Sequence, residues 1–150
     1  MRLVTGPLVK LSTLDINKIL YGHYYTAAKV IRGSYKTAPA AGTELISFTV
    51  PPKHRAAVLS ILLDATEGNI FEISWTSGGQ RYSYRLRLPA DGVVSYDFRP
   101  GLNLDLPADP NTEIVVKNLN EASDGSLYKV DMLVGIWLEY LDTGLVPLHM

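Results

Sequence analysis

The sequence predicts an all-β protein, built as a jelly-roll-like β-sandwich or barrel with an extended N-terminal arm. From Glu44 onward, apolar and polar residues alternate with a period of two in short runs. Turns rich in Pro, Gly, Asp and Asn separate these runs. With 150 residues, of which 47% are hydrophobic, the chain can bury one core. We therefore expect an arm over residues 1–43 and a sandwich domain over residues 44–150.

The first expected strands are the alternating runs 46–50, 57–63 and 71–76. The pair Gly78-Gly79 follows, and it suits the positive φ angles of a tight hairpin that leads into the run 81–88. Successive side chains of a strand point to opposite faces, so this run has a core face and an outer face. The expected core side chains are Tyr82, Tyr84, Leu86 and Leu88, and the expected outer ones are Arg81, Ser83, Arg85 and Arg87.

The remaining expected strands are the runs 94–98, 102–106, 114–116 and 130–140, again separated by Pro, Gly and Asp turns. Seven or eight short strands of this kind favour two closed sheets, because closure protects the strand edges. One face of the last run carries Val130, Met132, Val134, Ile136, Leu138 and Tyr140. Trp137 falls on the opposite face, which predicts an exposed contact surface there.

The expected arm shows no clear period. Its stretch 12–22, "STLDINKILYG", could form a short helix that ends at Gly22, and the arm closes with "TAPAAG". It is too rich in apolar and tyrosine residues for a solvated tail, so it must pack on its own sandwich or on a neighbouring subunit. Both alternatives are open, and we predict that the arm packs on a neighbour in a homotrimer.

Composition narrows the possible partners. The chain has 14 basic and 15 acidic residues, and this near-zero net charge predicts no nucleic-acid and no membrane partner. The absence of cysteine excludes disulfides and thiolate metal sites. We expect no signal peptide and no membrane span, because no apolar run is long enough and the N-terminal stretch is broken by charges, Gly and Pro.

The sequence also predicts no enzymatic activity, no cofactor and no bound metal. His23, His54 and His149 lack the spacing of a metal site, and no nucleotide-binding or hydrolase motif is present. The loop Asp105–Glu113 offers oxygen ligands that calcium could take. A turn built from Asp, Pro and Asn explains the same residues, and the sequence leaves both interpretations open.

Two surfaces could bind a partner. The arginines of the run 81–88 form either an ordinary solvated face or a basic docking face for an acidic protein. Aromatic residues such as Trp75 could stack on a sugar, but core filling is the simpler use. The predicted partner-binding residues are Tyr21, Tyr24, Tyr25, Arg32, Tyr35, Lys53, Arg55, Arg81, Arg85, Arg87 and Trp137.

Four short elements resemble those of small β-sandwich proteins in tailed-phage virions. They are "TVPPKHRAAVLSI" at 49–61, "PADG" at 89–92, "LDLPAD" at 104–109 and "EY" at 139–140. With the long arm added, the whole chain is similar to the capsid decoration (auxiliary head) proteins of thermophilic long-tailed bacteriophages. In the opening element, the two prolines fix the chain direction and a basic cluster follows that can meet a partner.

This resemblance implies a structural protein without catalytic residues. It implies a homotrimer that sits on the capsid surface of the virion, binds the major capsid protein and cements the shell, after synthesis in the host cytoplasm. The alternatives are another virion part, such as a tail or baseplate sandwich, and a carbohydrate-binding jelly-roll module. A cupin-like enzyme is disfavoured, because the usual cluster of metal-binding histidines is absent.

Overall fold

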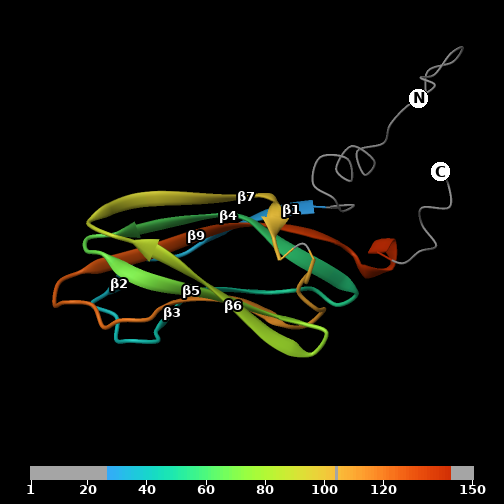
Figure 1. Cartoon of the computed structure of the whole chain (residues 1–150), viewed down its shortest axis with the longest axis horizontal. Helices are drawn as coiled ribbons and strands as arrows, with labels where there is room; N and C mark the ends of the chain where they lie inside the picture. Colours follow the sequence, from blue (N-terminus) through green and yellow to red (C-terminus); the bar gives the residue numbers. More distant parts are fainter. Residues whose placement is uncertain (1–26, 104, 143–150) are drawn as a thin grey trace, which may run out of the picture.

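The computed structural model describes residues 27–103 and 105–142, which form two antiparallel sheets packed face to face (Figure 1). Sheet A has the order β1 (Ala27–Arg32), β9 (Leu127–Leu138), β4 (His54–Ala65) and β7 (Gly92–Leu102), and β2 (Lys36–Thr37) also pairs with β9. Sheet B has the order β3 (Glu44–Thr49), β8 (Glu113–Asn118), β5 (Asn69–Ser77) and β6 (Gln80–Leu88). A 3-10 turn, η1 (Glu139–Asp142), follows β9. The predicted all-β sandwich is confirmed.

The strands pair from the ends of the chain inwards. β1 pairs with β9, β3 with β8, β4 with β7, and β5 with β6, each pair antiparallel. Taken from the outermost pair to the innermost, these pairs lie alternately in sheet A and in sheet B. The topology is that of one long β-hairpin whose two arms fold into both sheets. This nested order is the jelly roll, which the sequence also predicted.

Part of the expected arm belongs to the sandwich. β1 pairs with β9 of the same chain from Ala27↔Ile136 to Arg32↔Asp131, so the sheet begins well before residue 43. At Gly33 the backbone passes so close to β9 that a Cβ atom would lie 2.3 Å from the carbonyl oxygen of Val130. Only glycine fits that approach. The expected helix at 12–22 lies outside the described residues, and an arm that crosses to a neighbour stays a prediction for residues 1–26.

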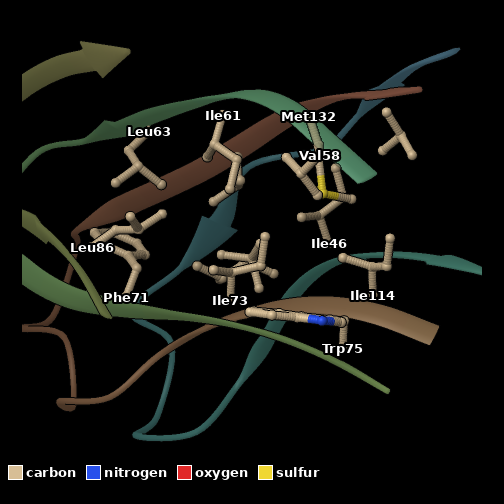
Figure 2. Close-up of a cluster of buried hydrophobic side chains, with 14 of the residues drawn as sticks. Ile46, Val58, Ile61, Leu63, Phe71, Ile73, Trp75, Leu86, Ile114 and Met132 are labelled. Atoms are coloured by element: carbon tan, nitrogen blue, oxygen red, sulfur yellow. The ribbon is translucent and has the colours of Figure 1, made fainter. Parts of the chain in front are cut away.

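The core lies between the two sheets (Figure 2). Alternate residues of β4 and β9 point down from sheet A, and alternate residues of β5 and β8 point up to meet them. Fully buried examples include Leu63 from β4, Phe71 from β5 and Met132 from β9, each at most 1% exposed. Burial of apolar surface at about 25 cal/mol per Å² is what holds the two sheets together.

The expected strand at 102–106 is wrong. β7 ends at Leu102, and Asn103 has a φ of 62°, a left-handed conformation that breaks a strand. The amide of Leu106 then donates to the carbonyl of Asn103 at 2.9 Å and closes a turn. Leu106, which the alternation placed in a strand, therefore lies in a loop.

Three expectations about side-chain exposure are also wrong. Tyr84 was expected in the core, but it is 56% exposed, since β6 is the last strand of sheet B and no further strand among the described residues pairs with it. Trp137 was expected on the surface, but it is fully buried, packed with Ala57 and Leu59 on the outer side of sheet A. Tyr140 is 58% exposed because β9 ends two residues earlier, at Leu138.

Candidate interaction surfaces

The outer face of sheet B carries a row of four alternating charges, here called the charged row. Glu44 on β3 is opposite Lys117 on β8, Lys117 is opposite Glu72 on β5, and Glu72 is opposite Arg85 on β6. The row thus begins with an acid at one edge of the sheet and ends with a base at the other. A second row of small residues runs beside it, through Ser47, Val115, Ser74 and Ser83.

Not all of these charges are satisfied within the chain. The Nζ atom of Lys117 lies 3.5 Å from Oε1 of Glu72, which makes an ion pair inside the charged row. Arg85 and Arg87 are exposed, and neither forms an ion pair with any residue in the described ranges. Two guanidinium groups on a rigid strand are therefore available to an acidic partner.

Arg81 differs from the other two arginines. Its guanidinium donates to Oγ1 of Thr76 at 3.0 Å, to Oγ of Ser74 at 2.9 Å and to the carbonyl of Glu113 at 2.8 Å. These bonds tie β6 to β5 and β8, so Arg81 holds its own sheet together. Arg81 also lines a polar depression of about 410 Å³ on this face. Its lining residues are Gly42, Glu44, Glu72, Ser74, Arg81, Tyr82, Ser83, Val115 and Lys117.

Asp109 occupies the loop in which calcium ligands were considered, and its carboxylate is held by the protein itself. Oδ1 accepts hydrogen bonds from Nη2 of Arg55 and from the amide of Gly78, both at 2.9 Å. Oδ2 accepts from the amide of Gly79 at 3.0 Å. The loop is therefore a turn that caps the β5–β6 hairpin. The guanidinium of Arg55 is bound to this loop, because it also donates to the carbonyl of Pro107. No group of three metal-binding side chains exists within the described ranges.

The outer face of sheet A carries a second polar cluster. The hydroxyl of Tyr35 donates to Oδ2 of Asp64 at 2.6 Å, and the ammonium of Lys129 lies 5.6 Å from the centre of the tyrosine ring. The hydrogen bond to Asp64, together with the negative charge of that carboxylate, raises the pKa of Tyr35 above its usual value. Arg32 reaches Asp131 at 3.8 Å but is largely exposed.

The predicted partner-binding residues therefore fall into separate groups. Arg81, Arg85 and Arg87 share the outer face of sheet B, as predicted, whereas Arg32 and Tyr35 lie near β9 on the other sheet. Lys53 is exposed in the turn before β4. Tyr21, Tyr24 and Tyr25 lie outside the described residues.

Sequence reasoning missed Glu44 and Lys117 as members of a surface. Glu44 and Lys117 are 73 residues apart in the chain and become neighbours only through the register of β3 on β8. No short-range pattern reveals such a register.

Within the part of the chain that the structure covers, no helix has the length and apolarity to cross a membrane.

Comparison with known proteins assigns the chain to no family. No family model matches it, and no curated protein matches it. Among solved structures, a chain in the capsid of Ralstonia phage GP4 is similar, with 18% identity, a TM-score of 0.48, and coverage of 74% of this chain and 85% of that one. The C-terminal domain of A223, a structural protein of Sulfolobus turreted icosahedral virus, has 17% identity and a TM-score of 0.34 over 73% of this chain and 98% of that one. The coat protein of Tobacco streak virus, solved as a dimer, has 14% identity and a TM-score of 0.38 over 73% of this chain and 84% of that one.

Proposed function

We propose that the chain is a non-enzymatic structural protein of a virion. In this proposal it is a capsid decoration protein that assembles as a homotrimer on the capsid surface, binds the major capsid protein and cements the shell. The turn motifs at 49–61, 89–92, 104–109 and 139–140 and their resemblance to phage decoration proteins suggest the role.

One observation carries the proposal: the guanidinium groups of Arg85 and Arg87 are exposed on the outer face of sheet B and form no ion pair with any residue that the structure describes. A sheet face is rigid, so it presents these charges in a fixed geometry, as repeated docking on an ordered shell requires. Asp109 and Arg81 fix the hairpin and strand that carry them. Residues 1–26 would add a second grip by reaching a neighbouring subunit, since an extended chain spans about 3.3 Å per residue.

The test is co-sedimentation of the purified chain with empty shells of the major capsid protein of the same virus. The proposal expects saturable binding and a higher melting temperature of the shells. Arg87→Glu should weaken the binding about tenfold, because it puts a like charge against an acidic partner. Lys36→Glu, the same charge reversal at an exposed site on sheet A, serves as the control and should bind normally. Absence of binding by the unmodified chain would refute the proposal.

A carbohydrate-binding module is the second candidate, and Tyr84 favours it. The Tyr84 ring is 56% exposed and stacks on Trp75, with ring centres 5.8 Å apart and planes 19° apart. An exposed ring with a rigid backing can stack on the apolar face of a sugar. Binding to glycans that is lost in Tyr84→Ala, without any binding to shells, would favour this function over the first.

A further inference from the structure

We propose that sheet B continues from one copy of the chain into the next, with the β6 edge of one copy pairing antiparallel with the β3 edge of its neighbour. This inference rests on the homo-oligomer of the proposed function and assigns its interface. The observations that carry it are two open sheet edges, the polarity of the charged row, and an uncovered pair of tyrosines.

Both edges have backbone groups that face away from their own sheet in matching positions. Gly78-Gly79 is a two-residue hairpin loop, so its flanking residues form a hydrogen-bonded pair and alternate residues of β6 turn their N–H and C=O groups away from β5. Those residues are Arg81, Ser83, Arg85 and Arg87. The carbonyl of Arg87 accepts the hydroxyl of Tyr96 from β7, at 2.5 Å, which agrees with this direction.

The alternation of inward-facing and outward-facing backbone groups can be followed from β6 across the sheet to β3. Ser83 pairs with Ser74, Ser74 with Val115, and Val115 with Ser47. The backbone groups of Ser74 and Val115 therefore face each other, and those of Ser47 face the open edge. Each strand of sheet B is antiparallel to the next, so β3 and β6 run in opposite directions. A neighbour that adds its β3 to β6 in the same orientation makes an antiparallel pair.

The charged row then continues across the junction. Within one copy the charges alternate from Glu44 to Arg85, so the next copy places its Glu44 beside Arg85. A β-bulge between Glu44 and Ile46 adds one residue to β3, so with Glu44 beside Arg85 the Ser47 of the neighbour lies beside Ser83. Opposite charges directly across a strand pair are stabilising, and a row with an acid at one edge and a base at the other complements itself.

The core side of the junction is equally complementary. Tyr84 is 56% exposed and Tyr82 is half-buried, although both point toward the core side of sheet B. At the opposite edge Phe48 is half-buried on that same side. The continued register brings Phe48 of the neighbour next to Tyr82, which covers apolar surface that a single copy leaves exposed.

Such an interface is head-to-tail, because two different edges of the chain meet. Head-to-tail contacts generate a ring when the rotation closes and a filament when it does not. The twist of sheet B and the short β3 strand of Glu44–Thr49 limit the contact to the part of β6 between Arg81 and Arg85. Arg87 lies beyond this footprint.

The experiment measures the oligomer mass of the full chain by light scattering and the dissociation constant by sedimentation equilibrium. Ser83→Pro removes an N–H group that faces the open edge and leaves the bonds to β5 intact, so the variant should fold but no longer accept a strand. Arg85→Glu and Glu44→Lys should each raise the dissociation constant about tenfold or more. The double variant E44K/R85E restores opposite charges at the junction and should recover most of the affinity.

Arg87→Glu is the matched control, with the same charge change on the same strand and face, and it should assemble normally. Circular dichroism melting of each variant confirms folding. A monomeric unmodified chain would overturn the inference, and so would an oligomer that S83P and both charge reversals leave unchanged. Shell binding by S83P, which keeps the charges of Arg85 and Arg87, reports separately on the proposed function, because a chain that binds shells without this interface keeps that function and loses only the inference.

Discussion

Glu67 shows how one partly exposed side chain organises a turn. Its Oε1 atom accepts the amide of Ser123 at 2.6 Å and the hydroxyl of Tyr128 at 3.2 Å, and so joins the β4–β5 turn to the loop before β9. The hydrogen bond from the Ser123 amide is the main reason that the pKa of Glu67 lies below its usual value. The folded state therefore favours the ionised carboxylate.

The lowered pKa of Glu67 predicts how the stability of the fold depends on pH. A carboxylate whose pKa is lowered on folding contributes stability above its unfolded pKa, and that contribution is lost as the pH falls through the folded value. Glu67→Gln should be less stable than the unmodified chain at neutral pH, and the difference should narrow as the pH falls below the usual glutamate pKa. Thermal melting of both proteins across this range checks it. A gap of constant size at every pH would contradict the assignment.

Tyr84 and Phe71 face the same core but should respond differently to truncation. Phe71 is 1% exposed, so Phe71→Ala should lower the free energy of unfolding by about 3–5 kcal/mol. Tyr84 is more than half exposed and contributes mainly its stacking on Trp75, so Tyr84→Ala should cost about 1 kcal/mol in the monomer. Urea denaturation at low protein concentration measures both. Equal losses would mean that Tyr84 is covered within a single copy.

At the scale of elements, the Asp109 loop fastens the β5–β6 hairpin to β4. Asp109→Ala removes the acceptor of two backbone amides and of Arg55, and should cost about 2–3 kcal/mol in urea denaturation. Arg55→Ala should cost less when Asp109 is already absent, because the two side chains share a bond. Strict additivity of the two losses would contradict the shared contact.

The strands of sheet B illustrate what a sequence can predict. Period-two alternation placed Arg85 outside and Leu86 inside, because one face of β6 must be buried. It failed for Tyr84, since alternation gives the face of a side chain but not whether a neighbouring strand covers it. It failed for Trp137 as well, because a residue on the outer face of a sheet can still be buried.

Pairing between strands that are distant in the sequence was the other feature that the sequence did not predict. β1 was missed because Ala27–Arg32 is mostly exposed and has no alternation of its own, and it becomes a strand by pairing with β9, about 100 residues later. The charged row was missed for the same reason, since its members come from four strands. Turn chemistry and alternation are local, whereas nested pairing is a property of the whole chain.

For the molecule as a whole, the first and last strands of the jelly roll are partners, and this gives a prediction about truncation. Deleting residues 2–26 leaves β1 and β2 on the edge of sheet A, whereas deleting residues 2–40 removes both strands and uncovers the edge of β9. It also removes Ile31, which packs against the core. The longer deletion should therefore melt about 5–10 °C below the shorter one. An uncovered β9 edge should also aggregate, because it offers unpaired backbone groups to other chains. The shorter deletion should keep the sandwich and the β3–β6 junction, and lose only what residues 2–26 add on a neighbouring subunit or a shell. Melting curves and oligomer masses of the two proteins decide this, and identical melting temperatures would mean that β1 contributes nothing to its own domain.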